Sequence, residues 1–318
     1  MSLLDHAKPF IEAAMNPSPT VLVLGLVFLL VGPILLHFLY SAVTPYTTIP
    51  SVLLVGPPGS GKTTLVTLFE RGPHFNNPSS PAAEAVSTRT AKTHTSASPS
   101  STELSISPAH PYTTDLDQAG ATSTKRFLLI DTPGHPKLRA RSVLQPLSSP
   151  DSTITVPASD GDSDKSPLKA VIFLVDAAAL ADGDSLPSTA EYLYDVLLSL
   201  QNRFHSRKGS RAPASMSVLV AANKLDLFTA LPASLVKSNL EAELGRIRAA
   251  RSKGLLDSGV GQDDVVERDD AWLGGDGSEK FKFDQMMEFD VEVEVIGGNA
   301  IGDGPGVDKW WKWVGERV

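Results

Sequence analysis

Cysteine is absent from the 318-residue sequence, which excludes disulfide bonds and thiolate metal sites and suits a reducing compartment. The seven histidines form no H-E-x-x-H motif and no close pair, so no zinc site is indicated. Positive charge is also scarce, because 28 Lys and Arg face 36 Asp and Glu and leave a net charge of -8. We therefore expect no direct binding of nucleic acid.

Charged residues are missing altogether from residues 13–61, and within that stretch residues 21–40 read VLVLGLVFLLVGPILLHFLY. A helix of about 20 apolar residues spans roughly 30 Å, the thickness of the hydrocarbon core of a bilayer. We predict a single transmembrane helix over residues 20–43, preceded by a short tail over residues 1–19. A buried core helix and a cleaved signal peptide are the alternatives, although a signal peptide has a shorter apolar region. The flanking charges are too few to set the orientation.

Continuous apolar runs alternate with helix-like segments in the remainder of the chain, residues 44–318. The runs predicted as strands are 126–131, 170–176, 216–223 and 289–296. The predicted helices are 188–204, 232–250 and a closing aromatic-rich segment, 307–314. This alternation predicts an α/β domain with a mostly parallel central sheet. Three stretches poor in apolar residues, 78–124, 148–167 and 253–280, are expected to be disordered or to form long inserted loops.

The glycine-rich segment after the apolar run 51–55 reads GPPGSGKT and matches the pattern G-x-x-x-x-G-K-[ST]. A helix-compatible segment follows, so the strand–loop–helix context of this motif is present. In such a loop, backbone N–H groups cradle phosphate oxygens, the lysine holds the terminal phosphates and the last hydroxyl ligates Mg²⁺. The phosphate-binding candidates are therefore Gly56, Pro57, Pro58, Gly59, Ser60, Gly61, Lys62, Thr63 and Thr64. Thr63 is also a candidate metal ligand.

Polar residues stand at the ends of three predicted strands, where ligands bind in α/β sheets: Asp131, Asp176 and Asn223. The first belongs to the segment DTPGH, in which Asp131 is placed to reach Mg²⁺. Gly134 in the same segment is placed to offer its N–H to a γ-phosphate. Taken alone, this segment fits an ordinary strand-end turn equally well.

The segment Asn223-Lys224-Leu225-Asp226 predicts which base is bound. The Asp226 carboxylate is placed to accept hydrogen bonds from N1 and N2 of guanine. Adenine offers no such pair of donors, and an unpaired buried acceptor is costly. The sequence therefore favours GTP over ATP.

The segments GPPGSGKT, DTPGH and NKLD, in this order, are those of small-GTPase-like P-loop proteins. With an apolar span before the domain and the strings DTPGHPKLR and AANKLDLF, the chain resembles the beta subunit of the signal recognition particle receptor. That family is a membrane-anchored GTPase related to the Arf and Sar branch. The similarity covers most of residues 21–318, apart from the three inserts.

The resemblance implies a cytosolic GTP-binding domain at the endoplasmic reticulum membrane. Its GTP-bound state would dock the alpha subunit of the receptor for co-translational protein targeting, with the ribosome or the translocon nearby. Hydrolysis of GTP would be slow or triggered by a partner. The alternative is a membrane-tethered GTPase of Arf/Sar or translation type, whose turnover drives transport or assembly.

The same resemblance implies three further site residues. Thr93, in the string THTS, is the choice for a second hydroxyl on Mg²⁺, with Thr95 and Thr90 left open. Asn299, in the string GGN, stands where the last base-contacting motif is expected. His135 stands where Ras-like proteins carry a glutamine that orients the attacking water, which makes it the catalytic candidate.

Overall fold

The computed structural model describes residues 19–43, 49–71, 93–106, 125–148, 153–156, 164–205, 215–257, 272–274, 280–302 and 306–318. The chain divides into two compact units, Met1–Thr47 and Thr48–Val318. The described part of the first unit is helix α2, Pro19–Val43, which contains Pro33 and falls where the sequence predicts a helix. Among the helices of the described residues, none reaches the length and apolarity of a membrane-crossing segment.

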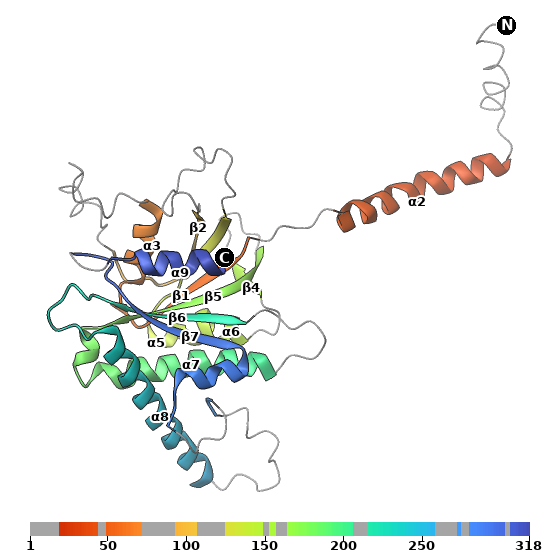
Figure 1. Cartoon of the computed structure of the whole chain (residues 1–318). Coiled ribbons are helices and arrows are strands. Elements are labelled where there is room, and N and C mark those ends of the chain that lie inside the picture. Colours follow the sequence, from red (N-terminus) through yellow and green to blue (C-terminus); the bar gives the residue numbers. More distant parts are fainter. Residues whose placement is uncertain are drawn as a thin grey trace, which may run out of the picture. The chain divides into compact units, whose positions relative to one another are not determined.

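The second unit is built on a sheet with the strand order β2-β3-β1-β5-β6-β7 (Figure 1). Its strands are β1 (Ser51–Val55), β2 (Ser100–Ile106), β3 (Lys125–Asp131), β4 (Thr153–Val156), β5 (Asp164–Asp176), β6 (Met216–Asn223) and β7 (Val291–Gly297). All neighbours from β3 to β7 are parallel, and β2 pairs antiparallel with β3 at one edge. Strand β4 pairs antiparallel with the beginning of β5. The expected α/β fold with a mostly parallel sheet is therefore confirmed.

Helices cover both faces of this sheet (Figure 1). Their bounds are α3 (Lys62–Arg71), α5 (Pro136–Arg139), the π-helix η3 (Ala140–Leu144), α6 (Gln145–Ser148), η4 (Ala179–Ala181), α7 (Ser185–His205), α8 (Ala233–Asp257), η7 (Phe283–Phe289) and α9 (Asp308–Arg317). Alternate residues of β1 show the two layers. Val52 and Leu54 pack with α3 and α9, whereas Leu53 and Val55 pack with α7 and α8. Because β1 is buried on both faces, the loop that follows it has a rigid base.

Parts of the three stretches expected to be loops are ordered, and there the expectation was wrong. Strand β2 lies within residues 78–124, and β4 and the start of β5 lie within residues 148–167. In the third stretch, α8 continues to Asp257, and Leu273 is completely buried. Gln201 fixes the segment around Leu273, because its amide donates to the Trp272 carbonyl and accepts from the Gly274 N–H. Residues 93–99 of the first stretch are also described and lead into β2, whereas residues 78–92, 107–124, 149–152, 157–163, 258–271 and 275–279 lie outside the described part of the chain.

Candidate nucleotide-binding site

The glycine loop connects β1 to α3 in a conformation that needs its glycines. Gly56, Gly59 and Gly61 have φ values of 149°, 76° and 98°, in the region that side-chain-bearing residues rarely adopt. A Cβ added to Gly61 would lie 2.5 Å from Nδ2 of Asn223. Ser60 closes the turn by donating from its hydroxyl to the Pro57 carbonyl over 2.9 Å. The loop therefore exposes backbone where a phosphate is expected, and none of these three glycines is replaceable without strain.

Lys62, the first residue of α3, lies across the loop. Its Nζ donates to the carbonyls of Gly56 and Pro57, both over 2.9 Å, and only 7% of the residue is exposed. Burial lowers the pKa of Lys62 to about 8, although the charge of Asp131 partly opposes that shift. A buried ammonium held by neutral carbonyls is poorly compensated, so the site favours an anion next to Nζ.

Thr63 and Asp131 form a pair of oxygen donors at the ends of α3 and β3. The Thr63 hydroxyl donates to Oδ2 of Asp131 over 2.7 Å. Oδ1 of Asp131 is buried and has no hydrogen-bond partner in the described part of the molecule. Burial raises the pKa of this carboxyl, while the Thr63 hydrogen bond and the Lys62 charge oppose the rise.

These donors suit a Mg²⁺ ion that is held partly by a ligand. No group of three or more His, Cys, Asp or Glu that could hold a metal occurs within the described ranges. A Mg²⁺ ion in a phosphate site needs only one or two protein oxygens, because water and phosphate complete its shell. The unpaired Oδ1 of Asp131 and the Thr63 hydroxyl therefore fit Mg²⁺ that arrives with phosphate.

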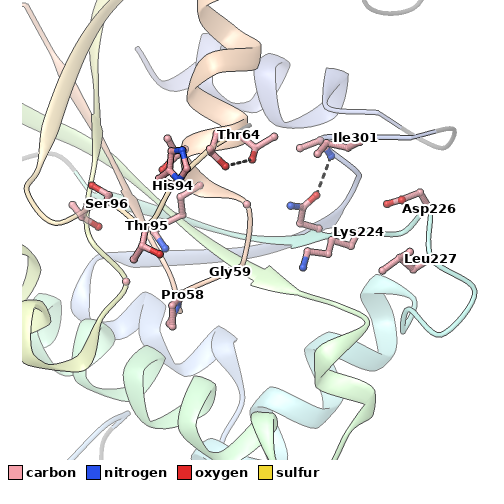
Figure 2. A pocket seen from close by; sticks show the side chains of 18 residues that line it. Pro58, Gly59, Thr64, His94, Thr95, Ser96, Lys224, Asp226, Leu227 and Ile301 are labelled. Atoms are coloured by element: carbon pink, nitrogen blue, oxygen red, sulfur yellow. Dashed lines mark hydrogen bonds between the residues drawn. The ribbon is translucent and has the colours of Figure 1, made fainter. Parts of the chain in front are cut away.

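A cavity of about 400 Å³ opens over the loop, and Figure 2 shows the side chains that surround it. It is lined by Pro58, Gly59, Gly61, Lys62, Thr63, Thr64, Thr93, His94, Thr95, Ser96, Thr132, Gly134, Asn223, Lys224, Asp226, Leu227, Ala300 and Ile301. Thr64, His94, Thr95 and Ser96 lie at one end in Figure 2, and Lys224, Asp226, Leu227 and Ile301 lie at the other. The predicted phosphate and base motifs thus meet in one space.

Thr93, the residue of the THTS string that is predicted to bind Mg²⁺, lies close to the glycine loop. Oγ1 of Thr93 lies 3.4 Å from Oγ1 of Thr64, within hydrogen-bonding distance. Both Thr93 and Thr95 line the cavity, so the structure keeps both as candidates for the second metal-binding hydroxyl. Thr90 lies outside the described residues.

The Asn223 side chain connects two loops at the cavity by hydrogen bonds. Its Nδ2 donates to the Ser60 carbonyl over 2.7 Å, and its Oδ1 accepts from the Ala300 N–H over 2.9 Å. Asp226 is exposed and lines the cavity. Gly302 lies against it with φ at 82°, and an added Cβ there would come within 2.9 Å of Oδ2 of Asp226. The missing side chain of Gly302 therefore leaves room for the Asp226 carboxylate.

Gly134 lies directly against the glycine loop. An added Cβ would come within 2.7 Å of the Pro58 nitrogen and 2.8 Å of Lys62 Nζ. Its carbonyl accepts from Nε of Arg139 over 3.2 Å, and the Arg139 guanidinium lies 3.9 Å from the centre of the Tyr192 ring. The DTPGH segment is thus held against the glycine loop, next to Lys62.

Six predicted site residues do not line the cavity: Gly56, Pro57, Ser60, Asp131, Asn299 and His135. The first four make the contacts described above, and the last two have other roles. Asn299 is buried and shapes the loop beside it, because its Nδ2 donates to the carbonyls of Ile301 and Gly302, both over 3.0 Å. His135 is exposed, and its Nδ1 accepts from the Lys137 N–H as the N-terminal cap of α5. In this conformation His135 makes the contact of a capping residue.

The motifs also missed residues that line the base end of the cavity. Leu227, Ala300 and Ile301 supply apolar surface there. Leu227 directly follows the NKLD segment, and Ala300 and Ile301 directly follow Asn299. Their closeness to those motifs is the only signal in the sequence that could have indicated them.

A glycine loop between a parallel strand and a helix, with a hydroxyl–carboxylate pair beside it, defines a P-loop nucleotide-binding protein. The family model described as "Signal recognition particle receptor beta subunit" matches residues 47–291 of this chain. The chain therefore belongs to the family of signal recognition particle receptor beta subunits.

The chain is also similar to individual proteins that carry this family's name. The receptor subunit beta of Saccharomyces cerevisiae is 28% identical over 273 residues, which cover 85% of this chain and 84% of the relative. The solved Chaetomium thermophilum structure named SRb-GDP-Mg is 55% identical, with a TM-score of 0.62, and the match covers 86% of this chain and all of that one. The SRb-GTP/SRX complex of the same organism gives 51% identity, the same coverage and a TM-score of 0.62.

Proposed function

We propose that this chain is the GTP-binding subunit of a signal recognition particle receptor, and that its GTP-bound state docks the receptor's alpha subunit. The observation that carries this proposal is one cavity lined both by Lys62 of the glycine loop and by Asp226 of the NKLD segment. Family membership supports it, and the similar Chaetomium thermophilum structures are named for GDP with Mg, and for GTP in a complex with SRX. The place of action would be the endoplasmic reticulum membrane, in co-translational targeting.

The cavity suggests how its residues divide the work of binding GTP. Backbone N–H groups of the loop from Gly56 to Thr64 would surround the phosphates, with Lys62 as the positive charge and Gly134 as a donor to the γ-phosphate. Asp226 would accept from N1 and N2 of guanine. Asn223 and Asn299 would act by fixing the loops around the base, in line with their hydrogen bonds.

Mg²⁺ would be held by the Thr63 hydroxyl, by Asp131 and by the Thr93 hydroxyl, the last with Thr95 as the alternative. When bound, the ion would neutralise charge on the β- and γ-phosphates. Hydrolysis is proposed to be slow without help, since His135 would first have to leave its capping contact with the Lys137 N–H. A partner that released His135 would bring the water-orienting candidate closer to the phosphates.

The charge-free stretch of residues 13–61, whose described helical part is α2, would hold the domain on the membrane as a single span. Helix α2 carries no Asp, Glu, Lys or Arg, and the large apolar side chains described within it are exposed, for example Phe28 by 78% and Leu29 by 71%. Exposed apolar side chains in such number call for an apolar partner. The experiment is alkaline extraction of membranes that contain the full chain or a chain beginning at Thr44. Only the full chain should stay in the membrane pellet, and equal release of both would contradict the anchor.

A nucleotide-dependent pulldown tests the docking function. The full chain, purified in detergent, is loaded with a non-hydrolysable GTP analogue or with GDP, and then offered a detergent extract of endoplasmic reticulum. The alpha subunit should be captured in the GTP state only. Lys62→Ala should abolish capture, whereas Lys312→Ala, which removes a lysine whose side chain is 80% exposed, should capture normally. Equal capture in both nucleotide states would reject the docking proposal.

Asp226→Asn tests recognition of the base separately. An amide in place of the carboxylate offers a donor to the extra carbonyl of xanthine, and it no longer accepts twice from guanine. GTP affinity should fall at least about tenfold, the size expected for hydrogen bonds to a charged group, while XTP binding should appear. Asp284→Asn, at an exposed carboxylate outside the cavity lining, is the matched control. Unchanged GTP affinity in Asp226→Asn would exclude Asp226 as the base-selecting residue.

A further inference from the structure

Asp176 is a strand-end carboxylate that the proposed function does not use. It ends β5 directly beside Asn223 of β6 in the sheet register, and it does not line the cavity. Both of its carboxylate oxygens are engaged. Oδ1 accepts from the N–H groups of Ala178 and Ala179 over 3.0 and 3.1 Å, and Oδ2 forms an ion pair with Nζ of Lys224 over 2.5 Å. The two backbone donors therefore fix the direction in which Oδ2 points.

The ion pair with Asp176 restrains a side chain that would otherwise be mobile. Its backbone has φ at 68°, and in the described ranges only one other non-glycine residue, Asp290, has a positive φ. The side chain lines the cavity and is only partly buried, with 34% of it exposed. A lysine side chain has many rotamers, so an unanchored one would leave the cavity wall for much of the time.

The ion pair decides which part of Lys224 the cavity presents. Lys224 lies at the same end of the cavity as the apolar side chains of Leu227 and Ile301 (Figure 2). With its ammonium bound to Asp176, the methylene groups of Lys224 are what the side chain can offer to that end. A planar base packs well against such surfaces. Without the pair, the ammonium would be free to turn into the cavity or out to solvent.

We propose that Asp176 is a positioning residue for the nucleotide: it holds Lys224 along the cavity wall and thereby slows nucleotide release. This inference rests on the proposed function, because it assumes that the cavity binds a guanine nucleotide. Asp176, which lies outside the P-loop, DTPGH and NKLD motifs, would then be one of the residues that determine how fast the nucleotide is released.

The alternative role for Asp176 is to stabilise the turn that precedes η4. Asp176→Asn separates the two roles. An asparagine Oδ1 still accepts from the Ala178 and Ala179 N–H groups, whereas the charge that Lys224 needs is lost. Lys224→Met removes the same ion pair from its other end and keeps an unbranched side chain.

The experiment measures release of a fluorescent GDP from the full chain in detergent, for wild type, both single variants and the double variant. Asp176→Asn should release GDP about fivefold faster, the upper size for an ion pair of this exposure. Lys224→Met should also release GDP faster. Adding Asp176→Asn to Lys224→Met should change nothing further, because the interaction is already gone. Release by Asp176→Asn at the wild-type rate would overturn the inference, as would an undiminished effect in the Lys224→Met background.

Two further readouts keep the result interpretable. If Asp176→Asn does not fold, the GDP release rates of Lys224→Arg and Lys224→Met test the inference instead. Lys224→Arg keeps a cation for Asp176, so it should release GDP more slowly than Lys224→Met. Equal release by these two Lys224 variants would overturn the inference. Failure of wild type to bind GDP or GTP would instead refute the proposed function itself.

Discussion

The ammonium of Lys62 makes nucleotide affinity depend on pH in a predictable direction. Burial lowers its pKa from an ordinary 10.5 to about 8, the charge of Asp131 opposes the shift, and the charge of Arg139 adds to it. Bound phosphate would place negative charge beside Nζ and raise that pKa again. Binding above pH 8 must therefore take up a proton, so the affinity falls as the pH rises through 8.

The size of the effect follows from the pKa of the empty site. With a pKa of about 8, Lys62 is about 90% protonated at pH 7 and about 10% protonated at pH 9. The apparent affinity should thus fall about tenfold between these pH values, or about 1.4 kcal/mol. The stability of the empty protein should move the other way. An unfolded lysine stays protonated up to about pH 10.5, so the free energy of unfolding rises between about pH 8 and 10.5.

Calorimetric titration with GDP at pH 7, 8 and 9 measures this linkage. Two buffers with different ionisation heats reveal the proton uptake directly. Lys62→Gln is the matched control, because it is neutral throughout and any titration of the base or metal affects both proteins alike. The ratio of wild-type to Lys62→Gln affinity should fall about tenfold from pH 7 to 9. A constant ratio would refute the assignment of this titration to Lys62.

Three substitutions test other parts of the site and core. Gly134→Ala should lower GTP affinity about tenfold and GDP affinity much less, in equilibrium titrations, because its Cβ would meet the Pro58 nitrogen at 2.7 Å. Trp310→Ala, at a fully buried ring, should lower the free energy of unfolding in urea by about 3–5 kcal/mol. Arg139→Ala should cost about 1–2 kcal/mol in the same assay, with Arg139→Lys recovering part, since it removes the contacts with Gly134 and Tyr192. An unchanged affinity or free energy of unfolding in any of these variants would contradict the prediction made for it.

The sequence was sufficient to predict the centre of the sheet and the glycine loop between β1 and α3. The central segments of β1, β3, β5 and β6 are continuous apolar runs, because both of their faces are covered. The glycine loop is a local motif whose backbone conformation depends on its own residues. Features of this kind are encoded by neighbours in the chain, so their positions were predicted to within a few residues.

The edge of the sheet was missed for the opposite reason. Strand β2 is rich in Ser and Thr, and only Leu104, Ser105 and Ile106 within it are buried. It forms because β3 offers hydrogen bonds along an otherwise open edge, and that partner is distant in sequence. The early start of β5 likewise depends on pairing with β4. Composition alone could not show either pairing.

Two residues of the candidate site show the same limit at the level of single side chains. The string containing Asn299 lies next to residues that line the cavity, yet the Asn299 amide faces its own loop and leaves the cavity surface to Ala300 and Ile301. His135 follows Gly134 in a phosphate motif but caps α5. Side-chain direction depends on the hydrogen bonds available in three dimensions, which motif spacing does not specify.

The two hydrogen bonds of the Asn223 amide have a consequence for how the empty protein behaves. They join the glycine loop at Ser60 to the loop at Ala300, and the NKLD segment begins at Asn223 itself. Three loops that would contact different parts of a bound nucleotide are therefore held together by one residue. They should open as one cooperative unit, so that amide hydrogen exchange in all three accelerates together when the nucleotide leaves.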